Sequence, residues 1–306
     1  MITWTIGAGG LLGSAIKRAS QRNFSAPSIP WDNQADAIHV LRVTAQEFAK
    51  QIQDEDWAIV WAAGSASTSS SAAEAELELR SLTALTEAIR EHRPAGHGVF
   101  FLTSSAGGIY AGAADPPFDE HTEPVPLSAY GELKFAQEQQ SISALADVYS
   151  VIVGRLSNLY GPGQNLDKLQ GLISRLALAS VTRQPINMFV SLDTMRDYIF
   201  TDDAASICLY WMRKALLSNE HTCSMKIIAS GQPVSLGYLI HLMQDITRTK
   251  VPVAFGSHAS SAAQALDLRL RPTGGAEVER FIATPLAAGT KLVYLDIVER
   301  YQRGLN

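Results

Sequence analysis

The segment that decides the fold is Ile2–Gly13, whose sequence is ITWTIGAGGLLG. A short apolar run comes first, glycines follow at three-residue spacing (Gly7, Gly10 and Gly13), and helix-forming residues continue from Leu11. Glycine lets the backbone turn sharply and approach a ligand closely, and the N-terminus of a helix attracts an anion. The segment therefore predicts a strand, a tight turn and a helix that binds the pyrophosphate of a dinucleotide. A merely tight turn is the alternative, and the position between a first strand and a helix favours the dinucleotide.

Strand-like and helix-like segments alternate along the rest of the chain. Buried apolar runs predict strands at 2–6, 57–62, 98–103, 149–154 and 225–229. Periodic apolar residues predict helices at 74–92, 129–147, 169–179 and 236–246. Units of about 20 to 40 residues of this kind are typical of right-handed βαβ winding and a parallel sheet.

The sequence therefore predicts an α/β fold, with a Rossmann-like doubly wound parallel sheet and a smaller C-terminal α+β substrate-binding domain. We assign residues 1–165 and 196–230 to the dinucleotide-binding domain. Residues 166–195 and 231–306 are assigned to the substrate-binding domain.

The composition excludes several classes of protein. Among 306 residues, 46% are hydrophobic and 18% charged, and the net charge of -5 provides no basic excess for nucleic acid. Only two cysteines occur, Cys208 and Cys223, which suggests reduced thiols and a cytoplasmic protein. The chain shows neither a basic signal-peptide start nor an apolar run of membrane-spanning length, and the scattered histidines lack metal-site spacing. We therefore expect no nucleic-acid partner, no membrane and no metal.

The adenosine end of the dinucleotide is less clearly marked. Residues 27–31 are interpreted as a second strand that ends at Asp32, although two prolines weaken it. An acidic residue at this distance from the glycines accepts hydrogen bonds from the ribose in NAD-binding folds, and a loop carboxylate that caps a turn is the alternative. No Arg or Lys lies between Asp32 and His39, which favours NAD; Arg18 or Arg42 could instead make NADP possible.

Two side chains of the expected helix 129–147 form an acid/base pair. Tyr130 and Lys134 stand one turn apart on the same face, where an ammonium favours the phenolate form of the tyrosine. A serine at the end of the strand 98–103 could hold a substrate oxygen against that phenol. Ala63 and Gly64, which follow the strand 57–62, would let a cofactor lie against the backbone, and the Ser/Ala-rich segment 65–73 is expected to be a mobile loop or a linker. A solvated helix face is the alternative for the Tyr/Lys pair.

Six blocks of sequence, in this order, resemble the extended short-chain dehydrogenases/reductases. The similarity is greatest to the NAD-dependent epimerase/dehydratase group that acts on nucleotide sugars. The blocks are GAGGLLG (7–13), WAAG (61–64), TSSAGGIY (103–110), PLSAYGELK (126–134), RLSNLYGPGQ (155–164) and RDYIFTDD (196–203).

The resemblance implies roles for residues at both ends of the site. Tyr130 is similar to the family's catalytic base, Lys134 to the residue that activates it and holds the nicotinamide ribose, and Ser105 to the hydroxyl partner, with Ser104 as the alternative. The expected cofactor contacts are Gly7, Gly10, Leu11, Leu12, Gly13, Asp32, Ala62, Ala63, Gly64, Tyr130 and Lys134.

The resemblance also implies a substrate site. Asn158 matches an asparagine that contacts the sugar nucleotide, and Arg196 matches the arginine that receives its pyrophosphate. A salt bridge from Arg196 to Asp197 or Asp202 is the alternative. Arg271 is a further candidate for the nucleotide, with a surface arginine as the alternative.

The chain departs from the family pattern in ways that bear on the reaction. Glu78 stands near a position where the family often has Asn. Ala106 and Gly107 replace the Asp-Glu pair of sugar 4,6-dehydratases, no Cys lies near Ser105, and no His lies between 121 and 221 for epimerisation at C3 and C5. We therefore expect C4 epimerisation through a transient ketone. A reductase of a nucleotide-linked keto-sugar or small ketone, and a non-catalytic cofactor-binding protein, are the alternatives.

The resemblance further implies a quaternary structure. In relatives, the helices that correspond to 74–92 and 129–147 pair across a two-fold axis, and both segments are interpreted as amphipathic. A homodimer is therefore expected.

Overall fold

The computed structural model describes residues 1–64, 66, 71–166, 171–218, 220–256 and 265–304. Most of the loop expected at 65–73 lies outside these residues, as do the first two residues of the helix expected at 169–179.

The centre of the molecule is a five-stranded sheet in which every neighbouring pair is parallel. Its strands, in spatial order, are β1 (Ile2–Ile6), β2 (Trp57–Trp61), β3 (Gly98–Ser105), β4 (Ser150–Leu156) and β9 (Cys223–Ile228). The strands β2 and β4 are buried over their whole length, because helices cover both faces of the sheet. The predicted α/β fold with a parallel sheet is confirmed.

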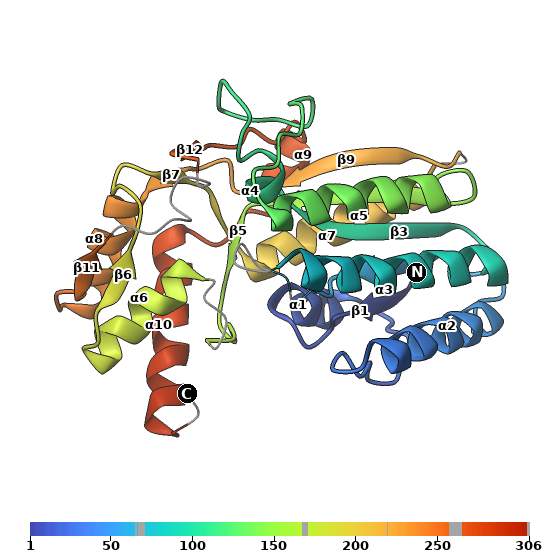
Figure 1. Cartoon of the computed structure of the whole chain (residues 1–306), viewed down its shortest axis with the longest axis horizontal. Helices are drawn as coiled ribbons and strands as arrows, with labels where there is room; N and C mark the ends of the chain where they lie inside the picture. Colours follow the sequence, from blue (N-terminus) through green and yellow to red (C-terminus); the bar gives the residue numbers. More distant parts are fainter. Residues whose placement is uncertain (65, 67–70, 167–170, 219, 257–264, 305–306) are drawn as a thin grey trace.

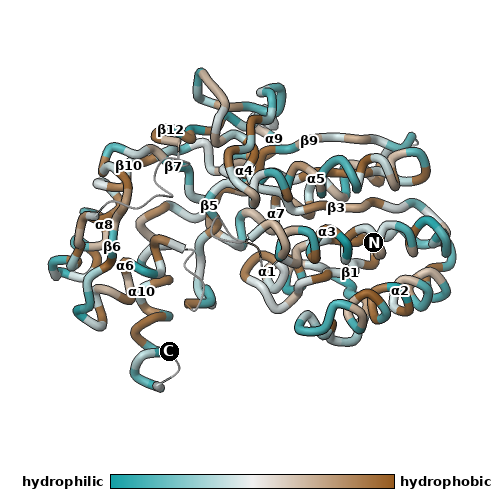
Figure 2. Tube along the Cα trace, in the orientation of Figure 1, coloured by the Kyte–Doolittle hydropathy of each residue, from teal (hydrophilic) through white to brown (hydrophobic). Residues whose placement is uncertain are grey.

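Five helices form the layers on the two faces of this sheet (Figure 1). One face carries α2 (Gln34–Gln51), α3 (Ala72–His92) and α5 (Ala129–Leu145), and the other carries α1 (Leu11–Ala19) and α7 (Thr201–Leu216). Alternate strand residues contribute to two cores: Phe100 belongs to the core on the side of α2, α3 and α5, whereas Phe101 belongs to the core on the side of α7. Strand β3 is accordingly hydrophobic along most of its length (Figure 2).

The segment 27–31 forms no strand, so this prediction is wrong. After α1 the chain makes a single bridge to β1, between Asn23 and Thr3, and then runs in an irregular path to the helix α2. Pro27 and Pro30 lack the N–H groups that a longer ladder requires, which accounts for the missing strand.

A smaller half of the molecule has a core of its own. It contains the helices α6 (Leu172–Thr182), α8 (Leu236–Thr247) and α10 (Leu286–Gln302) and the parallel strands β6 (Ile186–Met188) and β11 (Val253–Phe255). The short helix α9 (Ala276–Glu279) is different, because Val278 belongs to the core beneath α7. This segment thus packs on the larger half, although the sequence analysis assigned it to the smaller domain.

Short strands connect the two halves. The strand β5 (Asn158–Tyr160) pairs with β8 (Tyr198–Phe200), and β7 (Met195–Arg196) lies between β10 (Val234–Ser235) and β12 (Asp267–Leu268). The blocks around Asn158 and Arg196 therefore lie where the halves meet (Figure 1).

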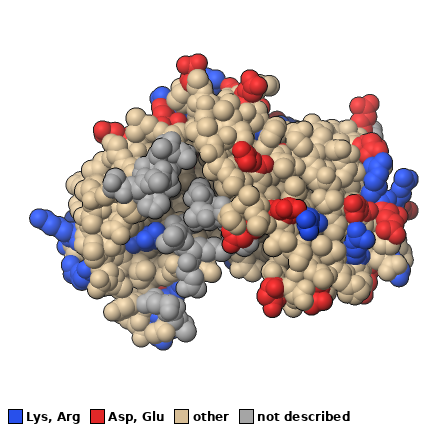
Figure 3. Space-filling view, viewed as in Figure 1, with Lys and Arg blue, Asp and Glu red and all other residues tan. Residues whose placement is uncertain are grey.

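The surface of the described residues carries mixed charge. On the face shown in Figure 3, acidic and basic side chains are interspersed over the larger half. In the described part of the chain, no helix is both long enough and apolar enough to cross a membrane.

Candidate functional site

The glycine turn between β1 and α1 brings three stretches of backbone into contact. A Cβ on Gly13 would lie 2.2 Å from the carbonyl oxygen of Gly7, and a Cβ on Gly7 would lie 2.6 Å from the backbone of Ala62 and Ala63. Gly7 also has φ +86°, a conformation that favours glycine. Only glycine fits at either position, so the turn lies directly against the end of β2.

This turn has the features of a pyrophosphate cradle. Gly10 is the N-cap of α1, and among the described residues no side chain caps the first turn of that helix. The first amide groups of α1 are thus not satisfied by a cap, and an anion fits such a site. Ala62, Ala63 and Gly64 follow the neighbouring strand at the same edge of the sheet.

Asp32 lies in an exposed turn rather than at the end of a strand. Asn33 follows it and caps α2 by accepting hydrogen bonds from the amides of Ala35 and Asp36. The Trp31 ring packs edge-on against Trp61, with 6.1 Å between the ring centroids, so the turn lies beside the end of β2. A contact between Asp32 and the adenosine ribose stays a prediction.

The predicted helix 129–147 is present as α5, and it places Tyr130 and Lys134 one turn apart. Ser128 caps the helix by accepting a hydrogen bond from the Gly131 amide. The Lys134 ammonium lies 5.8 Å from the centroid of the Tyr130 ring and is buried. The geometry of an ammonium beside a phenol is therefore as expected.

A second close backbone contact joins the start of α5, which carries Tyr130, to residues 104–108, here called the serine loop. A Cβ on Gly131 would lie 2.4 Å from the carbonyl oxygen of Gly108, and the Tyr130 ring lies 3.1 Å from the position of a Cβ on Gly108. Gly108 belongs to the one-turn helix α4 (Ala106–Ile109), and its amide donates to the Ser105 hydroxyl at 3.1 Å. Tyr130 and Ser105 thus contact the same residue.

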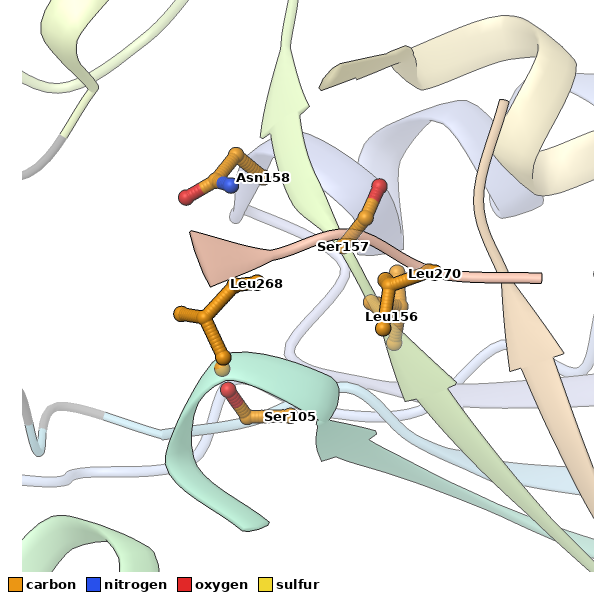
Figure 4. Close-up of a pocket in the computed structure, with 7 residues that line it drawn as sticks. Ser105, Leu156, Ser157, Asn158, Leu268 and Leu270 are labelled. Atoms are coloured by element: carbon orange, nitrogen blue, oxygen red, sulfur yellow. The ribbon is translucent and has the colours of Figure 1, made fainter. Parts of the chain in front are cut away.

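The two candidate serines face different surroundings. The Ser104 hydroxyl is buried and donates to Glu138 Oε1 at 2.5 Å. Ser105 lines a small pocket between the two halves. Figure 4 shows its hydroxyl near Leu268, with Asn158 further along the same opening.

That pocket combines polar groups with leucine side chains. It encloses about 300 Å³ of empty space, part of it open to solvent, and it is lined by Ser105, Gly107, Leu156, Ser157, Asn158, Leu268 and Leu270. Leu268 and Leu270 come from the segment around β12, which crosses the opening from the smaller half (Figure 4). Sequence reasoning did not find these leucines, because the spacing in that region is loose.

The expected substrate residues lie at different depths. Asn158 donates from Nδ2 to the carbonyl oxygen of Asp197 at 2.8 Å, which orients its side chain beside the pocket. Arg196 donates to the carbonyl oxygen of Met195, and burial lowers the pKa of its guanidinium. Arg271 is more exposed and pairs with Asp119 at 2.9 Å.

The structure does not support the salt-bridge alternative for Arg196. Among the described residues, Asp202 pairs with Arg18, and the Asp197 carboxylate accepts from Ser230 and Gln232. Roles for Asn158, Arg196 and Arg271 toward a ligand stay predictions.

A buried ionic network behind the serine loop was not predicted. Arg155 on β4 donates from Nε and from one terminal nitrogen to Glu138 on α5, at 3.0 and 2.6 Å, and from the other to the Tyr110 hydroxyl at 2.8 Å. Ser104 completes it by donating to Glu138. One available signal was that Glu138 stands four residues after Lys134, on the same face of the helix. The inner face of α5 is therefore partly polar, contrary to the simple amphipathic helix that was expected.

The parallel sheet, the glycine turn and the residues at its carboxyl edge define a Rossmann-fold protein of the extended short-chain dehydrogenase/reductase type. The chain belongs to the NAD dependent epimerase/dehydratase family, whose sequence pattern matches residues 5–222.

Two relatives of known activity are similar over part of the chain. A dTDP-4-dehydro-6-deoxyglucose reductase of Escherichia coli is 27% identical over 171 residues, which are 55% of this chain and 52% of that protein. A dTDP-L-rhamnose 4-epimerase of Burkholderia thailandensis is 32% identical over 124 residues, which are 40% of this chain and 33% of that protein. The matches thus span about half or less of these relatives.

Solved structures are similar over nearly the whole fold. The UDP-glucuronic acid 4-epimerase from Bacillus cereus, in complex with UDP-glucuronic acid and NAD, has a TM-score of 0.75 at 18% identity and covers 98% of this chain and 100% of that chain. RMD from Pseudomonas aeruginosa, complexed with NADPH, has the same TM-score and identity, over 98% of this chain and 99% of that chain.

The buried pair Glu138–Arg155 leads to a prediction about stability. Glu138→Gln should lower the free energy of unfolding by about 3–5 kcal/mol, because it leaves the Arg155 charge buried without its counter-charge. Denaturant unfolding measures the change. Glu132→Gln, on the exposed side of the same helix, is the control and should change the value by less than about 0.5 kcal/mol. Equal effects of the two substitutions would contradict the role given to the pair.

Proposed function

We propose that this protein is an NAD-dependent epimerase of a nucleotide-linked sugar that inverts the C4 carbinol through a transient ketone. The observation that carries the proposal is the approach of Ser105 and Tyr130 to the same residue, Gly108, with Lys134 beneath the Tyr130 ring. A hydroxyl donor, a phenol and an ammonium in this arrangement can exchange a proton with a substrate hydroxyl. The relatedness to sugar-nucleotide epimerases and reductases supports the same reaction class.

NAD fits the residues at the carboxyl edge of the sheet. The glycine turn and the N-terminus of α1 would hold its pyrophosphate, Ala62–Gly64 would flank it, and Lys134 would bind the ribose beside the nicotinamide. Bound there, NAD supplies a reversible hydride acceptor. Asp32 is the candidate for the adenosine ribose, and Arg18 on α1 and Arg42 on α2 are the candidates that would favour NADP instead.

The side chains of this chain move the proton and hold the substrate. Tyr130 accepts the proton of the C4 hydroxyl as the carbinol becomes a ketone, and it returns that proton when the ketone is reduced on its other face. Ser105 holds the substrate oxygen by a hydrogen bond, and Lys134 places a positive charge beside the Tyr130 ring. Asn158, Arg196 and Arg271 are the candidates for the sugar nucleotide. The overall reaction is redox-neutral, because the two electrons removed first are returned.

A keto-sugar reductase is the second candidate function. It would use Ser105, Tyr130 and Lys134 in the same roles, and the Escherichia coli relative is a reductase. A non-catalytic cofactor-binding protein is less well supported, because the chain keeps all three residues around one loop. Two free cysteines, one of them buried, support a reducing compartment such as the cytoplasm.

The reaction itself can be tested by NMR. Incubation of the purified protein with NAD and separate UDP-, dTDP- and GDP-sugars should invert C4 in at least one of them, without net reduction of the cofactor. Oxidation of added NADPH together with loss of a keto-sugar would instead identify the reductase. A 4-keto-6-deoxy product from a hexose would contradict both, because it requires dehydration.

Substitutions of Tyr130, Ser105 and Ser104 distinguish the roles of these side chains. Tyr130→Phe should lower kcat by about 100-fold or more while NAD binding is kept, because only the proton route is removed. Ser105→Ala should lower kcat in the same direction. Ser104→Ala should instead lower the free energy of unfolding by about 1–2 kcal/mol, since it removes a buried hydrogen bond to Glu138. Wild-type turnover in Tyr130→Phe would rule out the proposed base.

The helices α3 and α5 lie side by side on the outside of the larger half, which supports the proposed homodimer (Figure 1). Light scattering at micromolar concentration should give about twice the chain mass of 33.1 kDa. Leu77 on α3 is 43% exposed, and Leu77→Arg should shift the mass toward that of one chain if this face is the interface. A mass near that of one chain for the unmodified protein would refute the dimer.

A further inference from the structure

Glu78 is a buried carboxylate next to Lys134. It lies on α3, its side chain is 7% exposed, and the Lys134 side chain is 8% exposed. Its Oε1 accepts from Lys134 Nζ at 3.2 Å and from Gln137 Nε2 at 2.9 Å, and its Oε2 accepts from the amide of Ala66 at 3.2 Å. Donors from α5 and from the backbone after β2 therefore converge on one side chain.

A carboxylate suits this position better than an amide. Glutamate has two acceptor oxygens and no donor, whereas an Asn or Gln side chain has one acceptor oxygen and an NH₂ group. With an amide, an NH₂ group would face at least one of the donors from Lys134, Gln137 and Ala66. Burial alone would raise the pKa of Glu78, but the Lys134 charge and these hydrogen bonds keep the pKa below its ordinary value.

The same contacts determine the position of the ammonium. Lys134 has three N–H donors, and two of them point to Glu78 and to Gln137 Oε1, the latter at 2.9 Å. Because the three N–H bonds are at fixed angles to one another, these two hydrogen bonds determine the direction of the third N–H. A Cβ on Gly64 would also lie 3.0 Å from Glu78 Oε1, so the carboxylate packs beneath the backbone that follows β2.

We propose that Glu78 is a positioning residue that holds Lys134 and the backbone at Gly64 and Ala66 in one arrangement for the cofactor, and that its charge offsets that of Lys134 beside Tyr130. The inference rests on the proposed function in taking Lys134 as the residue that binds the nicotinamide ribose. Among the described residues, Lys134 is the charged group that faces Glu78 from α5, and on α3 the preceding Glu74 is turned away into the capping box with Ser71. Gln137 and Ala66 contribute only neutral donors.

Two consequences follow for Glu78→Gln. Lys134 and the backbone amide of Ala66 lose a common acceptor, so NAD should bind about 10-fold more weakly. The Lys134 charge is no longer offset. The fall of kcat/KM on the acidic side of its pH profile, here called the acidic limb, should therefore move to lower pH by about half to one unit. A merely structural glutamate would lower stability without moving that limb.

The experiment compares Glu78→Gln with Glu76→Gln. Glu76 is on the same helix, 62% exposed, and pairs with Arg80 on the surface. Its substitution therefore removes the same charge from the helix without touching Lys134. Calorimetric NAD titration and the pH profile should change for Glu78→Gln and stay at wild-type values for Glu76→Gln. Unchanged NAD affinity and an unmoved acidic limb in Glu78→Gln would overturn the proposal.

A double-mutant cycle covers the case in which the protein has no epimerase activity. In a Lys134→Ala background, Glu78→Gln should weaken NAD binding by less than the roughly 10-fold expected in the wild-type protein, because only its effect through the backbone at Gly64 and Ala66 is left. Independent, multiplicative effects of the two substitutions on NAD binding would overturn the proposal. The cycle measures binding only, so failure of the proposed reaction and failure of this inference give different results.

If Glu78→Gln does not fold, Gln137→Met replaces it. This substitution removes an acceptor from Lys134 and a donor to Glu78 but no charge. It should weaken NAD binding and leave the acidic limb where it is. Wild-type NAD affinity in Gln137→Met would count against the positioning role.

Discussion

The site depends on backbone segments that approach one another too closely for any side chain. At the end of β1, Gly7 lies against Ala62 and Gly13 lies against Gly7; at the start of α5, Gly131 lies against Gly108. The first pair of contacts shapes the turn at which α1 begins, and the second sets the distance between the tyrosine helix and the serine loop. A Cβ at Gly7, Gly13 or Gly131 would lie 2.2 to 2.6 Å from backbone atoms, so a larger residue would separate the elements.

Charged groups buried behind the loop support this arrangement. Glu138 and Arg155 join α5 to β4, while Ser104 joins the end of β3 to the same carboxylate. Burying such a pair costs desolvation free energy, which close geometry and additional hydrogen bonds offset. Glu78 and Lys134 form a second buried pair, with Lys134 on the same face of that helix as Glu138 and nearer the turn after β2. The polar inner face of α5 thus connects the elements that carry the serine, the tyrosine and the cofactor-side backbone.

The regular elements could be predicted from the local pattern, because the buried strands are continuous apolar runs and the helices repeat their apolar residues with helical period. The strands β1, β2, β3, β4 and β9 begin and end within two residues of the predicted runs, and α3 and α5 do so as well. The prediction of a strand at 27–31 failed because its apolar residues resembled a strand while its prolines lack the N–H donors that a strand needs. The smaller half was harder, since its strands are two or three residues long and its contacts come from segments far apart in the chain.

The sequence by itself determined the fold class, the glycine turn and the Tyr130/Lys134 pair, because apolar runs, glycine spacing and helical spacing are local properties of a chain. Only the tertiary structure decided that Ser104 faces Glu138 while Ser105 faces the pocket, since adjacent strand residues point to opposite sides and the neighbours on each side come from other elements. It likewise decided that Glu78 meets Lys134 across 56 positions of sequence, and that leucines from residues 268–270 cross the opening beside Ser105. Such contacts depend on how α3 packs against α5 and on where the segment around β12 lies, which no local pattern encodes.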